Sequence, residues 1–287
     1  MDFTEIRRIA ITALFSDDML LDRLVLKGGN ALSLVYKLTS RTSLDLDFSM
    51  ANDFDDFADA RERIFRALRD RFDSSGYVVF DERLEVKPKL HGEDTKPWWG
   101  GYELRFKLID KVKYEALKHR PAKLSISALV TGTGQDRTFT VDISKGEYTE
   151  GKAEREFDYF TIYVYTPEMI VIEKLRAICQ QMLEYEHRGR RTARGRDFYD
   201  IYRVVTSCGI ELGTEENHDL ARHIFTAKHV PLSLLANMPR EREYHRPDWH
   251  AVVDSTAERL EAFDFYFDFV LSQVERLKPL WVENTPL

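Results

Sequence analysis

The clearest pattern of apolar and polar positions lies between residues 24 and 49. A short apolar run, Leu24 to Leu26, ends at the tetrapeptide KGGN, and the apolar residues after it recur at helical spacing. The segment SLDLDFS then alternates apolar and polar residues as a strand does. The pattern therefore predicts a strand, a glycine turn, a helix and a second strand in this order.

The rest of the first half alternates helical and strand-like segments. Apolar stripes predict amphipathic helices over residues 3–15 and 53–72, the second of them ended by Ser74-Ser75-Gly76. β-rich composition predicts strands over residues 77–87, 101–109, 123–131 and 138–144. The first half is therefore expected to be α/β (α+β), with a mixed sheet.

The second half begins with a well-marked helix start. Thr166 is a suitable N-cap, Pro167 suits the first helical position, and Glu168 suits the first turn. Residues after it are mainly helical by pattern. We therefore expect two domains, a catalytic core over residues 1–165 and a helical domain over 166–287 that completes the active-site cleft.

Composition restricts the class of protein. With 287 residues, 43% hydrophobic and 32% charged, the chain resembles an ordinary soluble protein and contains no apolar run long enough to span a bilayer. The N-terminus lacks a basic region and a cleavage site, so a cytoplasmic location without a membrane is expected. A net charge of −7 excludes a uniformly basic nucleic-acid coat. The two cysteines, Cys179 and Cys208, are expected to be buried on helices rather than disulfide-bonded.

Two acids in the second predicted strand suggest a metal site. Asp45 and Asp47 are two residues apart, so both carboxylates project from one face while Leu46 and Phe48 point into the core. Like charges this close repel unless a cation lies between them. Oxygen ligands alone favour a hard ion such as Mg²⁺ over zinc.

Other polar residues leave alternatives open. Asp142 lies opposite Val141 and Ile143 in its strand, where it either faces solvent or joins the first two acids. Lys174 falls between buried positions, so it either reaches solvent, which is the favoured interpretation, or projects into a cleft beside the carboxylates. Asp197 and Asp200 either compensate the dipole of the helix they begin or take part in the site.

Basic residues are concentrated in one segment. His187, Arg188, Arg190, Arg191, Arg194 and Arg196 follow one another closely, with Arg203 further on, in an otherwise acidic protein. Such a loop either binds a triphosphate or an RNA backbone, or is a solvated connection between helices.

Two aromatic groups also have more than one interpretation. Trp98 and Trp99 either stack on a base or cover a sheet edge, the second being favoured. The aromatic helix near the C-terminus either belongs to the core, which is favoured, or docks an antitoxin or a second subunit.

Four motifs together resemble a known family. KGGNAL at 27–32, RTSLDLDF at 41–48, EKLRA at 173–177 and RDFYDIY at 196–202 are similar to the ordered motifs of the AbiEii/AbiGii nucleotidyltransferase-like toxins. The match covers about residues 20–205. The family usually has Thr or Ser after the glycine pair, where this chain has Asn30.

The resemblance implies a polymerase-β-type nucleotidyltransferase fold and a place in a bacterial toxin–antitoxin or abortive-infection system, with a cognate antitoxin as partner. Some members transfer nucleotides from an NTP to the 3′ end of tRNA and so block translation. Carried over by position, the implied site has Asp45 and Asp47 as metal ligands, Ser43 beside them, Lys174 at the nucleotide and Asp197 as the last acid.

The motifs and the resemblance favour one mechanism. Lys27, Gly28, Gly29, Asn30, Arg41, Ser43, Lys174 and Arg196 are the expected nucleotide-binding residues, with Asp142 as base or second-metal ligand. Mg²⁺ is the expected cofactor and an NTP and RNA the expected substrates. The alternatives are a kinase or nucleotidyltransferase acting on a protein or small molecule, and a non-catalytic binding module of the same fold.

Overall fold

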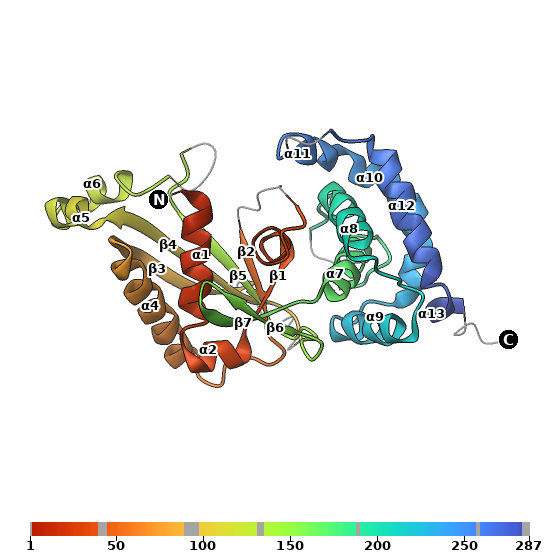
Figure 1. Ribbon diagram of the computed structural model, residues 1–287, viewed down its shortest axis with the longest axis horizontal. Helices are drawn as coiled ribbons and strands as arrows, with labels where there is room; N and C mark the ends of the chain where they lie inside the picture. Colours follow the sequence, from red (N-terminus) through yellow and green to blue (C-terminus); the bar gives the residue numbers. More distant parts are fainter. Residues whose placement is uncertain are drawn as a thin grey trace. The chain divides into compact units, whose positions relative to one another are not determined.

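The computed structural model describes residues 2–39, 45–88, 98–130, 135–187, 190–256 and 259–282. It divides into two compact units, which are seen in Figure 1. The first unit contains Met1–Asn30, Ser43–Thr149 and Ala153–Val164, and the second contains Ala31–Thr42, Glu150–Lys152 and Tyr165–Leu287.

The division places two short segments of the first half in the second unit. Hydrogen bonds account for one of them, because Tyr36 donates to the Tyr165 carbonyl at 2.8 Å and Arg203 donates to the Leu38 carbonyl at 3.3 Å. Residues far apart in the sequence thus hold residues 31–39 against the rest of the helical unit.

A seven-stranded sheet forms the first unit, in the order β3-β4-β5-β2-β1-β7-β6. Its strands are β1 (Val25–Lys27), β2 (Leu46–Ser49), β3 (Tyr77–Lys87), β4 (Gly101–Asp110), β5 (Phe139–Ser144), β6 (Ala153–Phe157) and β7 (Phe160–Val164). The β2–β5 and β1–β7 pairs are parallel and the other pairs are antiparallel. The predicted mixed sheet in an α+β fold is confirmed.

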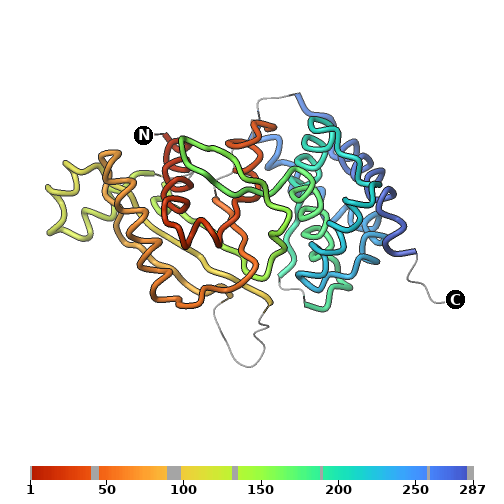
Figure 2. Tube along the Cα trace, turned by 60° about the horizontal axis from the view of Figure 1, so that its bottom comes forward, coloured from red at the N-terminus to blue at the C-terminus, as the bar shows by residue number. Residues whose placement is uncertain are grey.

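Two long helices cover one face of this sheet, as Figures 1 and 2 show. They are α1 (Phe3–Leu14) and α4 (Phe57–Ser74). Aromatic side chains join them to the strands, since Phe3 lies 5.6 Å from Phe139 and Phe72 lies 5.8 Å from Phe106 between ring centroids. Because strand side chains alternate, the residues between these apolar positions point to the opposite face.

Short helices complete the first unit, and one of them corrects a prediction. They are α2 (Asp18–Arg23), α3 (Gly28–Asn30), α5 (Lys111–Leu117) and α6 (Pro121–Ile126). The strand predicted over residues 123–131 is wrong, because α6 occupies its first half. Pro121 starts the helix at a position where its missing N–H costs nothing, and Leu124 donates to the Arg120 carbonyl at 2.9 Å.

The second unit is helical. Its helices are η1 (Ala31–Val35, a π-helix), α7 (Pro167–Cys179), α8 (Gly195–Cys208), α9 (Glu215–Ala227), η2 (Leu232–Glu241), α10 (Arg242–His245), η3 (Arg246–Trp249), α11 (His250–Val253), α12 (Phe263–Arg276) and α13 (Pro279–Val282). The predicted start of α7 is confirmed, because the Thr166 side chain accepts a hydrogen bond from the Met169 N–H at 3.3 Å.

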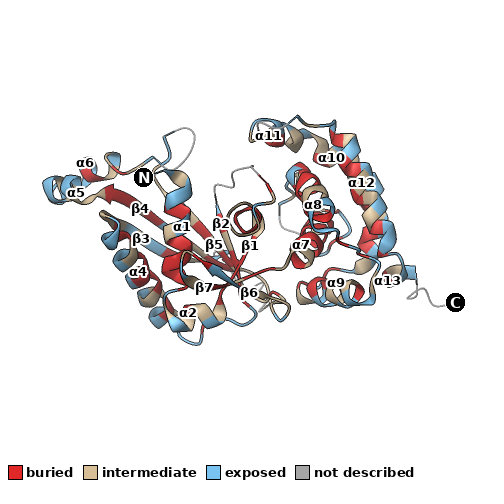
Figure 3. Ribbon diagram, in the orientation of Figure 1, coloured by how far each residue is buried: buried red, intermediate tan, exposed pale blue. Residues whose placement is uncertain are grey.

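Aromatic packing between α8 and α12 makes the core of this unit, where Figure 3 shows buried residues facing one another. Phe198 stacks on Phe267 with ring centroids 4.9 Å apart. Phe263 meets the Phe198 ring edge to face with centroids 5.5 Å apart. The favoured core role of the C-terminal aromatics is therefore confirmed for these residues.

The two cysteines differ in environment. Cys179 is fully buried at the end of α7, whereas Cys208 is exposed at the end of α8, and neither forms a disulfide. The prediction of two buried cysteines is thus correct for one. Among helices in the described ranges, none is long and apolar enough to cross a bilayer.

Candidate active site

A row of polar residues crosses the sheet on the face opposite α1 and α4. The parallel register of β2 and β5 pairs Asp47 with Asp142, and the neighbouring strands place Lys27 beside Asp47 and Glu103 beside Asp142. Residues paired across strands project from the same face. The structure therefore brings Asp142 next to Asp47, the arrangement that the strand alternation predicted as one alternative.

Lys87 balances part of this negative charge. Its Nζ lies 2.9 Å from Asp142 Oδ1 and 2.8 Å from Glu103 Oε2. Partial burial would lower the pKa of Lys87, but the hydrogen bonds to the two acids outweigh it and raise that pKa. The lysine thus stays charged beside the acid row.

The glycine turn lies against Asp47. Gly28 has φ +70°, and a Cβ atom there would stand 2.6 Å from Asp47 Oδ2. The positive φ therefore favours glycine at residue 28, and a Cβ atom there would push the Asp47 carboxylate aside. The preceding residue, Lys27, is buried and lies 3.5 Å from Glu147 Oε1 and 3.5 Å from Ser144 Oγ.

Asn30 connects the turn to Asp45. Its fully buried side chain accepts a hydrogen bond from Arg7 Nη1 at 2.8 Å and donates from Nδ2 to the Asp45 carbonyl at 2.6 Å. An amide can do both because its donor and acceptor are separate atoms. Both polar atoms of the Asn30 side chain thus form hydrogen bonds inside the protein. The predicted contact of Asn30 with phosphate would therefore use its main-chain N–H.

Arg7 is held in place on the inner side of this network. Its side chain is buried and its guanidinium lies over the Phe3 ring at 5.1 Å from the centroid. Burial lowers the pKa of Arg7, with Asp2 opposing the shift. Arg7 therefore positions Asn30, and through it the main chain at Asp45.

These residues supply carboxylate oxygens for a metal ion rather than a complete cage. Within the ranges that the structure describes, no three His, Cys, Asp or Glu side chains form a group that could hold a metal. Mg²⁺ is usually bound by one or two carboxylates together with water and substrate phosphates. The predicted ligands Asp45 and Asp47 stay a prediction. The predicted nucleotide contacts Arg41 and Ser43 lie outside the described residues.

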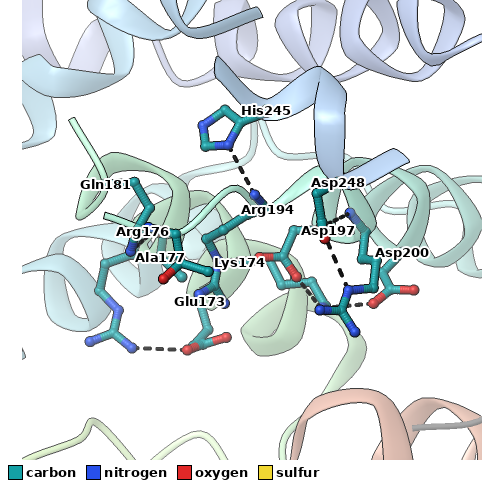
Figure 4. Close-up of polar contacts among 12 residues, drawn as sticks. Glu173, Lys174, Arg176, Ala177, Gln181, Arg194, Asp197, Asp200, His245 and Asp248 are labelled. Atoms are coloured by element: carbon teal, nitrogen blue, oxygen red, sulfur yellow. Dashed lines mark hydrogen bonds and ion pairs between the residues drawn. The ribbon is translucent and has the colours of Figure 1, made fainter. Parts of the chain in front are cut away.

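In the second unit, Lys174 lies in a buried ionic cluster (Figure 4). Its Nζ is 2.7 Å from Asp197 Oδ1 and 2.9 Å from Asp200 Oδ2, and Arg194 forms a further ion pair with Asp197. Only 6% of Lys174 is exposed. The favoured prediction of a solvated lysine is wrong, because two carboxylates one turn apart on α8 compensate its burial.

Asp197 lies in the first turn of α8, whose N-cap residue, Arg194, makes no capping hydrogen bond with its side chain. Burial would raise the pKa of Asp197, yet the charges of Arg194 and Lys174 outweigh burial and hold that pKa well below its usual range. Asp197 therefore remains ionised and binds α8 to α7. The predicted roles of Lys174 and Asp197 at a nucleotide stay predictions.

His245 completes this cluster from α10. Its Nδ1 accepts the Arg194 main-chain N–H at 3.0 Å, so its proton is on Nε2, which is buried and has no hydrogen-bond partner among the described residues. Burial lowers the pKa of His245 to about 4, with Asp197 opposing the shift. The histidine is thus neutral and packs on Phe198 at 5.5 Å between centroids.

Three arginines of the basic segment form ion pairs within the protein, and Arg188 lies outside the described residues. Arg191 forms an ion pair with Glu241 and lies 3.6 Å above the Tyr244 ring centroid, and Arg194 belongs to the buried cluster. Arg196 is about half exposed, with Nε 3.6 Å from Asp248 Oδ2. Arg191 and Arg194 do not fit the alternative of a solvated connection, whereas the predicted phosphate contacts of this segment stay a prediction.

Trp98 and Trp99 precede β4 and contact each other. Their rings meet edge to face with centroids 5.8 Å apart. Their two predicted roles are not distinguished by this contact.

The sheet-face residues that motif analysis missed carry a readable signal. Glu103, Arg105 and Lys107 alternate with Tyr102, Leu104 and Phe106 in β4, so the middle of one face of this strand is charged. Their proximity to Asp142 depends on the β4–β5 register, which the sequence does not specify.

An α+β chain with carboxylates clustered beside a glycine turn has the features of a phosphoryl-transfer protein. Residues 10–269 match the family model of the nucleotidyl transferase AbiEii toxin of type IV toxin–antitoxin systems. The chain belongs to this family of nucleotidyltransferases, as the motif resemblance predicted. No curated protein matches it.

Two solved structures are similar over most of the chain. One is the crystal structure of an H. pylori protein assigned as a nucleotidyltransferase, with 18% identity and a TM-score of 0.46, covering 99% of this chain and 97% of that one. The other is an antigenic nucleotidyltransferase-like protein from Paracoccidioides brasiliensis, with 15% identity and a TM-score of 0.37, covering 87% and 94%. The family assignment depends on the family model and not on these two.

Replacing Lys174 by methionine should destabilise the helical unit strongly. The change leaves Asp200, which is fully buried, without the ammonium 2.9 Å away, and breaking such a pair costs about 3–5 kcal/mol of the free energy of unfolding. Urea unfolding measures this loss. The matched control is Lys278→Met, which removes an exposed lysine paired with Glu275 and should leave the midpoint unchanged. Equal midpoints for both variants would contradict the buried cluster.

His245 should make stability depend on pH between about 6.5 and 4. In this window the unfolded chain binds a proton that the folded protein excludes, because burial lowers the folded-state pKa to about 4. The free energy of unfolding should therefore fall as pH falls, by at most about 1.4 kcal/mol per pH unit. His245→Asn keeps an acceptor near the Nδ1 position but does not titrate, so its slope should be shallower. Unfolding curves with the same slope in both proteins would exclude this effect.

Proposed function

We propose that this protein is a toxin that transfers a nucleoside monophosphate from an NTP to an RNA acceptor, with Mg²⁺ as cofactor. The acceptor we favour is the 3′ end of tRNA, whose modification would inhibit translation. The observation that supports this most is the pairing of Asp47 with Asp142 beside Gly28, where a Cβ atom would lie 2.6 Å from the Asp47 carboxylate. Membership in a type IV toxin–antitoxin family also implies an antitoxin as partner.

The acid row fits the requirements of Mg²⁺. Asp47 and Asp142 supply hard oxygen ligands from adjacent strands, and water and substrate phosphates would supply the remaining ligands. When held by Asp47 and Asp142, the ion would supply positive charge that neutralises the leaving pyrophosphate. The chain itself has to hold the α-phosphorus in line with the acceptor hydroxyl.

Each group of the first unit has a proposed role in that step. Main-chain N–H groups of Gly28, Gly29 and Asn30 bind the triphosphate, with Lys27 as the nearby cation. Asp142 accepts the proton of the acceptor hydroxyl. The hydroxyl oxygen then bonds to the α-phosphorus as the bond from phosphorus to the pyrophosphate breaks. Lys87, 2.9 Å from Asp142, keeps that carboxylate oriented.

The decisive experiment is transfer of labelled nucleotide. The protein is incubated with each α-labelled NTP and Mg²⁺ in the presence of total RNA, of aminoglycosides, or alone. Label is expected in RNA, and Asp47→Asn should reduce it by at least about 100-fold because a metal carboxylate is lost. Asp70→Asn, an exposed change on α4, is the matched control and should transfer normally. Label only in protein or drug would move the acceptor to another class, and no label in any arm would reject the transferase.

Gly28→Ala should weaken Mg²⁺-dependent nucleotide binding by about tenfold or more, since the new Cβ would displace the Asp47 carboxylate from 2.6 Å away. Isothermal titration with a non-hydrolysable NTP measures the affinity. Gly76→Ala is a close control, because Gly76 also has a positive φ, +83°, but a Cβ placed there would have no described atom within 4 Å. Both changes strain the backbone, so only a difference between them reports on the carboxylate. If the two variants bind nucleotide equally well, Gly28 does not act through Asp47.

A further inference from the structure

A cavity of about 400 Å³ opens on the charged face of the sheet, next to the acid row. Arg83 of β3, Arg105 and Lys107 of β4, and Thr138 and Thr140 at the start of β5 line it. The lining therefore combines three cations with two hydroxyls. Asp81 and Asp136 are the acids of the lining, which leaves a formal charge of +1 in a protein of charge −7.

The strand register ties this cavity to the acid row. Arg83 pairs with Arg105 and Arg105 pairs with Thr140, which makes a second row directly beside the row that contains Asp142. Thr140 precedes Asp142 by two residues on the same face of β5, a separation of about 7 Å along the strand. A polymeric substrate whose end lies at Asp142 can thus place its next monomer in the cavity.

The two arginines favour an anion between them. Like charges directly opposite each other across strands destabilise a sheet, and Arg83 and Arg105 are such a pair. Asp81 lies 3.0 Å from Arg83 Nη2, and Glu103 forms an ion pair with Arg105 Nη2. Each guanidinium has five N–H donors, so these contacts leave other donors of the same forks for a ligand. The Arg83 side chain is 63% exposed and that of Arg105 is 48% exposed.

Lys107 gives the cavity a fixed wall. Its Nζ lies 2.9 Å from Asp81 Oδ2 and donates to Ser125 Oγ of α6 at 2.9 Å, and its side chain is only 18% exposed. Asp81 therefore lies between Lys107 and Arg83, and the hydrogen bond from Lys107 is the main cause that lowers the pKa of Asp81. This arrangement holds Arg83 at the cavity mouth.

The order of the strands shows on which side of the acid row the cavity lies. Gly28 follows β1, the acids lie on β2 and β5, and the cavity spans β5, β4 and β3. In phosphoryl transfer the attacking and leaving oxygens lie in line on opposite sides of the phosphorus. If pyrophosphate leaves on the β1 side, at the glycine turn, then the attacking hydroxyl has to enter from the β4 side. The cavity lies along that path.

We propose that this cavity binds the backbone phosphate next to the attacking nucleotide of a single-stranded RNA 3′ end. Arg83 and Arg105 hold the phosphate oxygens through their guanidinium forks, and Thr138 and Thr140 donate hydroxyl hydrogen bonds. The inference rests on the proposed transferase function and adds to it the subsite that receives the acceptor. Because it contacts phosphate and not base edges, it contributes affinity without sequence preference.

The test measures RNA binding apart from catalysis. A fluorescent single-stranded RNA with an unlabelled 3′ end is titrated with protein at several KCl concentrations and followed by anisotropy. The double variant Arg83→Gln/Arg105→Gln should bind about tenfold more weakly near 0.1 M salt, and the slope of log Kd against log salt should fall by about 1.4, for two lost contacts. Each single variant, which disturbs the sheet less, should lower the slope by about 0.7.

Arg61→Gln is the matched control. Arg61 is also an exposed arginine in an ion pair, with Glu62, but it lies on α4 at the other face of the sheet. It should change neither the affinity nor the slope. A single-stranded DNA of the same sequence tests whether the 2′-hydroxyl adds affinity, and polyglutamate tests whether any polyanion is accepted.

The outcomes separate this subsite from the proposed function. Equal RNA affinity and slope in the wild type and the double variant, or equally tight binding of polyglutamate, would overturn the subsite. Binding of Mg²⁺ and a non-hydrolysable NTP to the wild type is measured in the same preparation. Its absence would reject the transferase whatever the RNA titration gives, whereas its presence with unchanged RNA binding would reject only the subsite.

Discussion

The parallel pairing of β2 with β5 is the constraint on which the candidate site depends. It places Asp47 beside Asp142 on adjacent strands about 5 Å apart, so that two like charges are held close together and repel each other. The contact of Asp142 with Lys87, a lysine that is 54% exposed, offsets at most about 1 kcal/mol of this. The strand register therefore keeps two like charges together on the sheet face opposite α1 and α4.

The surrounding residues keep the acids in this arrangement. Leu46 and Phe48 anchor β2 on the helix-covered face, because both are fully buried. Gly28 leaves space for the Asp47 carboxylate, and Asn30 holds the main chain at Asp45 through a hydrogen bond of 2.6 Å. The hydrophobic core thus fixes the position of the polar row. Gly28 and the Asn30 side chain position the residues at the β1 end of that row.

The helical unit contains buried charges of both signs. Two cations, Lys174 and Arg194, meet two carboxylates, Asp197 and Asp200, in a buried cluster whose formal charges cancel. Such a cluster adds little to stability relative to apolar packing, but loss of one member is costly because its partner stays buried and charged. It therefore fixes how α7 packs on α8. His245 joins α10 to the same place by accepting the Arg194 N–H.

The sequence by itself determined the elements whose signals are local. The β-rich segments 77–87 and 138–144, the Thr166-Pro167 helix start and the glycine turn at 28 all reappear in the structure, since strand propensity, capping and backbone freedom depend on the residue and its near neighbours. A local signal also failed once, at residues 123–131, where β-rich composition competed with a proline that starts a helix. Only the tertiary structure decided which strands pair and in which register. That register put Asp142 with Asp47, gathered Arg83 and Arg105 beside them, and buried Lys174 between two acids, because contacts between distant segments follow from packing of the whole chain.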